Sequence, residues 1–321
     1  MSKNLIIFGA GASIGSEENN MPPLGNRLFD ELVTFSPNGW GNIPEDLAKI
    51  FQNDFEKGME ELSVKYPDSM TQIQSVMAKF FFRYRPTTSS LYVKMAEKIK
   101  ENQWDGSLST LNYERLLELS LRHAGLMPKF QSSGFPEIEM CYPHGCCNFF
   151  CEGLTGTGNL RIGRNGVSFG PGGSLNFGQG GSLNFSSGGI TTGGTSLKII
   201  NDQFLFNQKI GEAFPPVMSY FITSKFTTSC ANFIQNERDR FNKLVADADN
   251  IAIIGIMVRE HDGHIWDSLA STSAAITYCA GSSGKQYSEW AKENRTDFKK
   301  DSVLDGYWDE NFDEICTNVD L

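Results

Sequence analysis

Short apolar runs alternate along this chain with longer stretches in which apolar residues recur every three or four positions. The first run, residues 3–8, is rich in Ile and Leu and leads directly into a glycine. Similar runs occur at 251–254 and 274–278, and residues 107–111, Ser-Leu-Ser-Thr-Leu, are predicted as a further strand. Because helical stretches separate these runs, the pattern predicts an α/β fold, a Rossmann-like parallel sheet flanked by helices.

The predicted strands fall in three parts of the chain, about 1–35, 105–150 and 248–285. We therefore expect a single split domain that includes all 321 residues. Residues 36–104 interrupt it with helical periodicity and are predicted to be a helical insertion. Residues 286–321 form a polar, acidic C-terminal tail, whose large aromatic rings are expected to pack on the domain or on a partner: Trp290, Tyr307, Trp308 and Phe312.

Residues 151–207 contain a second insertion, dense in Gly, Ser, Asn and Thr. The hexapeptide Gly-Gly-Ser-Leu-Asn-Phe occurs in it twice, at 172–177 and 180–185. A period of eight residues with Leu and Phe in matching places predicts short strands joined by glycine turns, a Gly-rich β arm. The composition is also that of a disordered linker. The recurring Leu and Phe favour the structured arm, because a linker does not need them.

Acidic residues outnumber basic ones: 38 Asp and Glu against 28 Lys and Arg give a formal net charge of −10. A broad nucleic-acid-binding face needs clustered Lys and Arg, so direct contact with nucleic acid is not expected. The opening apolar run ends at Gly9, too early for a secretory signal, and no apolar stretch approaches the ~20 residues that cross a bilayer. These features predict a cytoplasmic protein without a membrane contact.

Seven cysteines, an odd number, predict reduced thiols rather than a disulfide framework. Four of them crowd within eleven residues: Cys141, Cys146, Cys147 and Cys151. They contain no Cys-x-x-Cys pair, so buried free thiols are favoured over a zinc site. His261 and His264 flank Asp262 at a spacing that suits a solvated loop better than a metal pair. No metal is therefore expected.

The first candidate binding motif is Gly9-Ala10-Gly11-Ala12-Ser13, directly after the opening strand. Glycines there allow a tight turn and let the backbone approach a diphosphate, whose charge the following amides stabilise. The motif departs from Gly-x-Gly-x-x-Gly because Ile14 stands where the third glycine belongs. A plain turn between a strand and a helix explains the same residues equally well.

The second motif, Thr110-Leu111-Asn112-Tyr113-Glu114, ends a predicted strand. Ligands of doubly wound sheets bind at the carboxyl ends of strands. The Asn112 amide offers both a donor and an acceptor, so it can hold a ribose hydroxyl or orient a water molecule. The alternative is an asparagine that caps the following helix.

The third motif is Tyr142-Pro143-His144-Gly145. A histidine held between proline and glycine can face a pocket as a general base. A lone histidine is more often a hydrogen-bonded structural residue, so the weight of His144 comes from the motifs that accompany it.

Taken in order, Gly-Ala-Gly-x-Ser, Thr-x-Asn-Tyr-Glu, His-Gly and Ile-Ile-Gly resemble the sirtuin-like (SIR2-like) family. They are most similar to its bacterial branch of NAD⁺-depleting antiphage effectors. The resemblance covers about 1–35, 105–150 and 248–280 and implies that NAD⁺ is the substrate. It implies catalytic roles for Asn112 and His144. It also implies that the dinucleotide lies against seven residues: Gly9, Ala10, Gly11, Ser13, Thr110, Gly255 and Asp262.

The resemblance further implies an NAD⁺ hydrolase that releases nicotinamide and ADP-ribose when triggered. It implies homo-oligomers and a separate activating partner, such as a HerA-like ATPase or a short Argonaute-type protein. The family's protein deacylases carry two Cys-x-x-Cys pairs and a Pro-Asp-Phe-Arg segment, and this chain has neither. Hydrolysis is therefore favoured over protein deacylation or ADP-ribosylation. A scaffold that binds NAD⁺ or ADP-ribose without cleaving it remains the alternative from another class.

Overall fold

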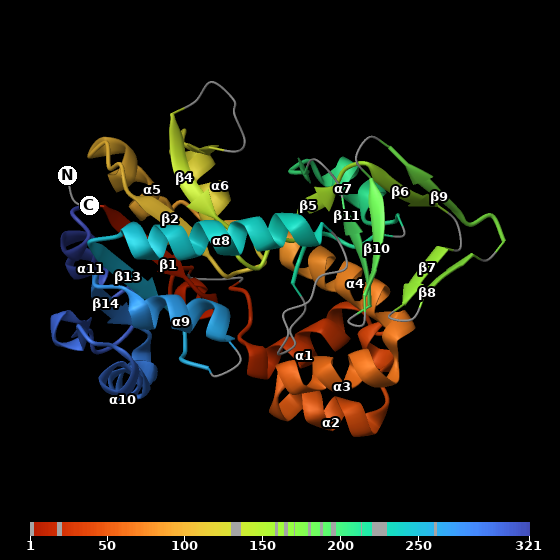
Figure 1. The fold of residues 1–321 in the computed structure, drawn as a ribbon, viewed down its shortest axis with the longest axis horizontal. Helices are drawn as coiled ribbons and strands as arrows, with labels where there is room; N and C mark the ends of the chain where they lie inside the picture. The colour runs from red at the N-terminus through yellow and green to blue at the C-terminus, as the bar shows by residue number, and fades with distance from the viewer. Residues whose placement is uncertain are drawn as a thin grey trace. The chain divides into compact units, whose positions relative to one another are not determined.

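A computed structural model describes most of the chain. The chain divides into two compact units (Figure 1). The described residues are 3–17, 21–129, 136–157, 160–163, 166–169, 171–178, 181–186, 189–193, 197–212, 214–219, 230–259 and 262–321. The first, or sheet unit, consists of Met1–Pro22, Tyr84–Pro143 and Glu237–Leu321. The second unit consists of Pro23–Arg83 and His144–Asn236. None of the described helices is both long and apolar enough to span a bilayer.

The sheet unit is built on seven parallel strands. Their spatial order is β15 (Ser302–Val303), β14 (Ala275–Cys279), β13 (Asn250–Ile254), β1 (Asn4–Phe8), β2 (Ser107–Thr110), β4 (Glu137–Cys141) and β3 (Met127–Pro128). Every pair of neighbours in this sheet is parallel. Helices lie between most of these strands in the chain, so the predicted fold class, a Rossmann-like parallel sheet flanked by helices, is confirmed.

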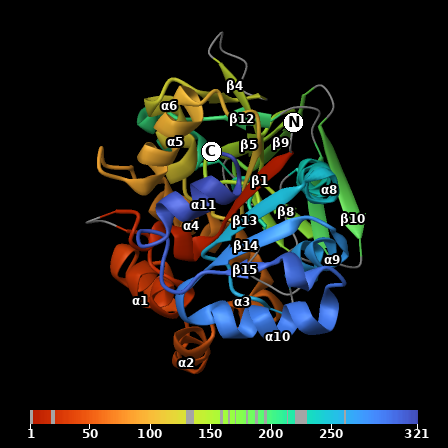
Figure 2. The same cartoon turned by 90° about the vertical axis from the view of Figure 1, so that its left-hand side faces the viewer.

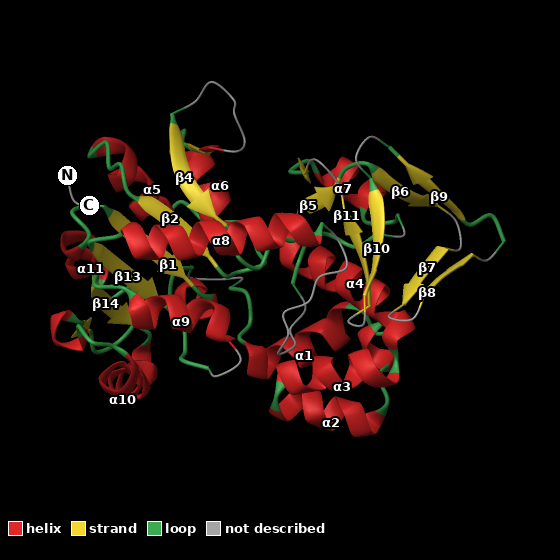
Figure 3. Cartoon of the chain, viewed as in Figure 1, coloured by secondary structure: helices red, strands yellow, loops and turns green. Residues whose placement is uncertain are grey.

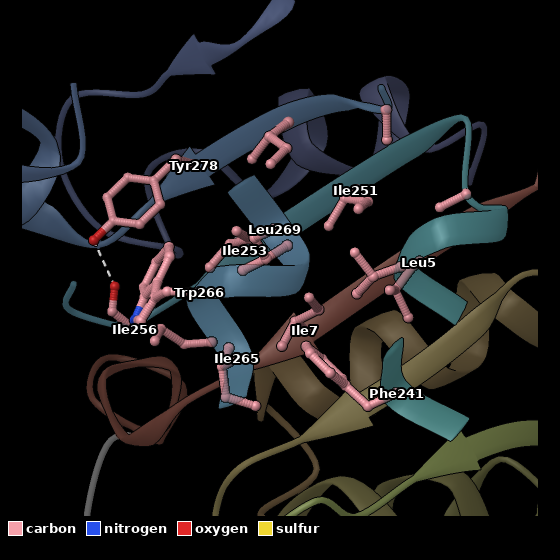
Figure 4. Close-up of a cluster of buried hydrophobic side chains, with 14 of the residues drawn as sticks. Leu5, Ile7, Phe241, Ile251, Ile253, Ile256, Ile265, Trp266, Leu269 and Tyr278 are labelled. Atoms are coloured by element: carbon pink, nitrogen blue, oxygen red, sulfur yellow. Dashed lines mark hydrogen bonds between the residues drawn. The ribbon is translucent and has the colours of Figure 1, made fainter. Parts of the chain in front are cut away.

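One face of the sheet carries alternate residues of β1, β13 and β14, because successive side chains of a strand point to opposite faces. Leu5, Ile7 and Ile253 on this face are almost completely buried. Three helices cover them: α8 (Ala231–Asp247), α9 (Gly263–Ser271) and α10 (Gly284–Asn294). Figure 4 shows Ile265, Trp266 and Leu269 of α9 packed over these strand residues.

The opposite face is covered by α5 (Leu91–Glu101), α6 (Leu116–His123) and α11 (Phe312–Asn318). The Phe8 ring of β1 lies 5.4 Å from the Tyr92 ring of α5 and 5.5 Å from the Trp308 ring. Figure 2 shows α5 and α11 on one side of β1, and α8 and α9 on the other. The sheet is therefore buried on both faces, which explains why its central strands β1 and β13 are continuous apolar runs.

The C-terminal residues belong to this core rather than trailing from it. They supply the edge strand β15, the helix α11 and the buried indole of Trp308, whereas Tyr307 is 51% exposed. The guanidinium of Arg295 donates to both carboxylate oxygens of Asp301 and to the backbone oxygens of Leu269 and Ala274. This buried ion pair fixes the turn before β15 to the end of α9.

The second unit begins with four helices: α1 (Gly25–Phe35), α2 (Glu45–Asn53), α3 (Phe55–Lys65) and α4 (Met70–Phe82). The Phe29 and Phe51 rings stack at 5.0 Å, and Trp40 packs edge-on against Phe51. The segment predicted as one helical insertion, 36–104, is divided between the units. Its helices α2, α3 and α4 lie in the second unit, whereas α5 packs against α6 in the sheet unit.

The Gly-rich segment forms antiparallel hairpins in the second unit, drawn as yellow arrows in Figure 3. The pairs are β6 (Leu154–Thr157) with β9 (Ser174–Phe177), β7 (Leu160–Gly163) with β8 (Gly166–Phe169), and β10 (Ser182–Ser186) with β11 (Gly189–Gly193). A further pair, β5 (Phe149–Cys151) with β12 (Leu197–Ile199), precedes helix α7 (Gln203–Lys209). The structured arm is confirmed over the linker.

The second unit also contains a disulfide between Cys151 and Cys230. The prediction of seven reduced thiols is therefore wrong for this pair. The two residues are 79 positions apart, and their Cα atoms come within 5.5 Å because β5 ends beside the start of α8. Spacing along the sequence carries no information about that approach. The other five cysteines are free and buried.

The ion pair before β15 makes a stability prediction. Asp301→Ala leaves the Arg295 guanidinium buried without its counter-charge, so it should cost about 3–5 kcal/mol of unfolding free energy. Lys300→Ala is the matched control, because the Lys300 side chain is 53% exposed and its loss should cost less than about 0.5 kcal/mol. Urea unfolding followed by tryptophan fluorescence measures both. Equal midpoints for the two variants would contradict the structural role of the pair.

Candidate active site

The order of the strands places a crossover point between β1 and β13. On one side of β1 the chain forms β2, then the edge strand β3 and then β4 between them, and on the other side it runs outward from β13 through β14 to β15. Because all these strands are parallel, their carboxyl ends lie at the same edge of the sheet. Doubly wound sheets bind their ligands outside this edge, at the point where the strand order reverses. The glycine motif after β1 and Gly255 after β13 both lie there.

Two glycine loops pack directly on each other at the crossover point. The Gly9 amide donates to the Ile254 oxygen and the Gly11 amide to the Gly255 oxygen, each at 2.9 Å. A Cβ on Gly9 would lie 2.7 Å from the Gly255 oxygen, and one on Gly11 would lie 2.9 Å from the Gly255 Cα. Gly255 itself has φ +69°. These glycines are therefore required by the approach of one loop to the other, whatever ligand binds.

Four polar side chains form a buried cluster next to this point. Ser13 follows the glycine loop, Tyr92 lies on α5, and Asn112 and Glu114 follow β2. The Ser13 Oγ donates to Glu114 Oε1 at 3.1 Å and lies 3.2 Å from the Tyr92 hydroxyl. The Asn112 Nδ2 lies 3.1 Å from Glu114 Oε1 and 3.4 Å from both hydroxyls. We call these four residues the polar cluster.

The Asn112 side chain has its nitrogen inside the polar cluster. Its Oδ1 accepts no hydrogen bond from any described residue, and the side chain is not wholly sealed, since 6% of the residue is exposed. The backbone amide of Asn112 donates to the Thr110 hydroxyl at 3.1 Å, which fixes the turn after β2. An amide held in this way presents a carbonyl oxygen to a ligand.

The alternative explanation of Asn112 is that it caps the following helix, but the side chain that caps α6 is that of Glu114. Its Oε2 accepts from the Leu116 amide at the first turn of α6. A carboxylate is favoured there because unpaired amides and the helix dipole make the N-terminus positive. Burial nevertheless dominates and raises the pKa of Glu114, against the hydrogen bonds from Leu116, Ser13 and Asn112 and the charge of Arg115. Burial and the Glu114 charge likewise raise the pKa of Tyr92 well above its ordinary value.

The structure thus brings together six of the predicted site residues: Gly9, Gly11, Ser13, Thr110, Asn112 and Gly255. Ala10 is exposed on the same loop. Asp262 is half-buried at the position before α9. Ser13 differs from expectation in one respect, because its hydroxyl is buried in the polar cluster rather than exposed for a diphosphate.

His144 is the first residue of the second unit, so its approach to Asn112 stays a prediction. Within that unit its backbone oxygen accepts from the Ser219 amide at 2.9 Å, and the residue is buried. Gly145 follows at φ +75°, where a Cβ would lie 1.9 Å from the Val217 oxygen. This contact requires glycine and fixes the backbone that presents His144.

Two of the cysteines considered for metal binding have surroundings that disfavour a metal. Cys151 is bonded to Cys230 and cannot serve as a thiolate ligand in that state. Burial and the neighbouring Glu237 raise the pKa of the Cys141 thiol well above its ordinary value, which opposes the thiolate form that metals bind. His261 lies outside the described residues, so the solvated loop predicted there is not described.

Sequence reasoning missed Tyr92 and the role of Glu114. Glu114 stands two residues after Asn112, and a buried acid near a helix start is a signal that was present in the motif. Tyr92 stands 20 residues before Asn112 on a helix with an ordinary apolar face, so nothing in the sequence distinguishes its hydroxyl.

No family model and no curated protein matches this chain. Several solved structures are similar in overall chain path. A serine-to-alanine mutant of a Sir2 homologue bound to ADP-ribose has a TM-score of 0.42 and 15% identity, over 99% of this chain and 92% of that chain. A Sir2 homologue–NAD complex has a TM-score of 0.38 and 17% identity, over 99% of this chain and 90% of that chain. A structure described as the structural basis of sirtuin substrate affinity has a TM-score of 0.44 and 11% identity, over 98% of this chain and 93% of that chain.

The packing of the two glycine loops yields a second prediction. Gly255→Ala places a methyl group at φ +69° against the Ala12 amide, where the Cβ distance would be 2.0 Å. We expect a loss of about 2–4 kcal/mol of unfolding free energy. Gly25→Ala is the control, because its Cβ would meet nothing closer than 4.0 Å. Chemical denaturation compares them, and a Gly255→Ala protein as stable as the Gly25→Ala protein would refute this packing.

Proposed function

We propose that this chain binds NAD⁺ at the carboxyl edge of its sheet and hydrolyses the bond between nicotinamide and ribose. The observation that carries the proposal is the fixed amide of Asn112 beside the crossover point, with its nitrogen held by Glu114 and its oxygen outside the cluster. Dinucleotides bind doubly wound sheets at such a point. The motifs that resemble the SIR2-like family support the same ligand.

The proposed reaction exploits the charge of the leaving group. Nicotinamide is cationic in NAD⁺, and when its bond to ribose breaks, the bonding electrons pass to the ring nitrogen and the ribose carbon gains oxocarbenium character. Water then adds to that carbon and releases a proton, so the products are nicotinamide, ADP-ribose and H⁺. The Asn112 Oδ1 can accept a hydrogen bond from a ribose hydroxyl or from the attacking water, and its negative end stabilises the developing cation.

We assign the base to His144, as the resemblance implies. Imidazoles gain and lose a proton near neutral pH, which suits a group that takes a proton from water or from a ribose hydroxyl. Strand β4, the neighbour of β2, ends at Cys141, and His144 follows three residues later in the chain. In this proposal His144 and Asn112 act on the same ribose.

Two features of the chain favour hydrolysis over acyl-lysine chemistry. The Gly-rich arm stands where deacylases carry their zinc module, and the Pro-Asp-Phe-Arg segment is missing. We further propose a cytoplasmic antiphage effector that assembles as a homo-oligomer. NAD⁺ depletion would begin when a trigger or a separate partner, such as a HerA-like ATPase or a short Argonaute-type protein, activates it. Neither nucleic acid nor a membrane is proposed as a direct ligand.

The third prediction tests the reaction and its residues together. The purified full chain, alone and with a candidate partner, is incubated with NAD⁺ while nicotinamide release is followed by chromatography. We expect Asn112→Ala and His144→Ala each to lower kcat by at least ~100-fold, the usual effect of losing a group that acts on the transition state. Asn53→Ala and His123→Ala are matched controls on exposed helix ends and should keep the wild-type rate.

Other outcomes identify the competing functions. NAD⁺ consumption that requires an acyl-lysine peptide indicates a deacylase, and label transferred to protein indicates an ADP-ribosyltransferase. Tight NAD⁺ binding without turnover under any partner condition indicates a scaffold. Full turnover in both alanine variants would show that the residue assignment is wrong even if the reaction is right.

A further inference from the structure

The contacts of the polar cluster determine where its protons lie. Ser13 has one hydroxyl proton, and its geometry sends that proton to Glu114 Oε1. Ser13 Oγ can then only accept from the Tyr92 hydroxyl, 3.2 Å away. The Asn112 amide supplies two more protons, one to Glu114 Oε1 and one shared between the two hydroxyl oxygens. Every donor has an acceptor in this assignment.

The assignment works only when Glu114 is ionised, since a protonated carboxyl would add a fifth donor to the same small space. It also decides how the Asn112 amide is turned. Rotating the amide by 180° would place its carbonyl oxygen 3.1 Å from a carboxylate oxygen, two acceptors in contact without a proton between them. A buried polar group left in that state is costly, so the cluster holds the nitrogen inward.

We propose that Tyr92, through Ser13 and Glu114, is a positioning residue that fixes the orientation of the Asn112 amide. Tyr92 stands on α5, outside every motif around the site, and its ring is locked between Phe8 and Trp308 with centroids 5.4 and 4.9 Å away. A hydroxyl held so rigidly keeps the Ser13 proton directed at the carboxylate. The expected effect on kcat rests on the proposed function. The expected orientation of the Asn112 amide rests on the contacts alone.

The described residues that act electrostatically on Glu114 and Tyr92 include charged groups from three segments of the chain. Tyr92 faces it from α5, Arg115 follows it in the chain, and Glu17 acts on Tyr92 from the loop after Ser13. Arg115 favours the ionised form of Glu114, whereas burial opposes it. Because burial raises the pKa of Glu114, the amide should lose its fixed orientation as the pH falls through that raised value, and kcat should fall with it.

Substitutions of Tyr92 and Glu114 test their role in positioning the Asn112 amide. Tyr92→Phe should lower kcat ~3–10-fold and Glu114→Gln ~10–100-fold, with KM within about threefold of wild type, because a hydrogen bond is lost near the reacting atoms without a contact to the substrate. Glu114→Gln should also abolish the acidic limb of the kcat profile, and Glu114→Asp should partly restore kcat. Tyr287→Phe removes another buried hydroxyl, bonded to Asp301 on the far side of the sheet, and is the control.

A second readout does not depend on turnover. The side-chain NH₂ signals of Asn112 in a ¹⁵N spectrum, assigned by their loss in Asn112→Asp, should exchange slowly with water and shift as Glu114 titrates. In Tyr92→Phe they should exchange at least ~5-fold faster. Fast exchange in the wild-type chain, or wild-type exchange and kcat in both Tyr92→Phe and Glu114→Gln, would overturn the proposal. A chain that never cleaves NAD⁺ but passes the exchange test would refute only the proposed function.

The Gly-rich arm supports a separate inference. Its strands pair two by two, and among the described residues no third strand joins any pair. The ring of Phe169 on β8 and that of Phe177 on β9 are each 56% exposed. Residues 165–197 contain no charged side chain and a single proline, Pro171. Monomeric proteins normally protect strand edges with lysine or proline, and strands β8, β9, β10 and β11 contain neither.

We propose that the arm pairs edge to edge with the arm of a second copy of this chain. A nucleic acid would require clustered cations, and residues 165–197 of the arm contain none. The chain outside residues 165–197 carries the net charge of −10, so electrostatic repulsion between two copies is weakest at this uncharged stretch. The strand Ser-Leu-Asn-Phe occurs twice in the arm, in β9 and β10, so each copy offers the same edge more than once.

The fifth prediction concerns assembly. Light scattering after size-exclusion chromatography should show oligomers of the full chain, and Phe177→Lys or Phe169→Lys should raise the dissociation constant at least ~10-fold. Val64→Lys, at a position on α3 that is 62% exposed, is the matched control and should assemble normally. Circular dichroism checks that each variant is folded. A monomeric wild type at every concentration, or assembly unchanged by both phenylalanine variants, would overturn the proposal, even if the arm bound a different macromolecule.

Discussion

One buried carboxylate organises the centre of the sheet unit. Glu114 is buried, and an isolated buried charge costs several kcal/mol unless donors surround it. The donors come from three separate places: the Ser13 hydroxyl after β1, the Asn112 amide after β2, and the first backbone amide of α6. Satisfying a single anion therefore fixes the ends of two strands and the start of a helix relative to one another.

The same arrangement links folding to the proposed chemistry. The Asn112 oxygen is useful only if its orientation is certain, and side-chain amides are otherwise free to turn about the last torsion. Here the orientation follows from acceptors and donors that are already needed for stability. A site built in this way pays no additional ordering entropy when a ligand arrives, which is the meaning of preorganisation.

Much of the sheet could be predicted from sequence, because strands buried on both faces leave uninterrupted apolar runs such as Ile-Ala-Ile-Ile at 251–254. The glycine loops and Asn112 were predictable for the same local reason, since they directly follow such runs. Tyr92 and the disulfide between Cys151 and Cys230 were not, because each depends on elements far apart in the chain that meet only in three dimensions. Strand β15 is two residues long, too short for any periodicity to reveal it.

The disulfide has a consequence for how this chain can vary. It joins residues 79 positions apart and so encloses the whole Gly-rich arm in a covalent ring. Closing a ring of that size lowers the entropy of the unfolded chain, which stabilises the folded state by roughly 4–5 kcal/mol. This stabilisation depends only on the logarithm of the ring's length. Doubling the arm would change it by about 0.6 kcal/mol. Hairpins can thus be gained or lost inside the ring at little thermodynamic cost, while β5 and the start of α8 stay tied together.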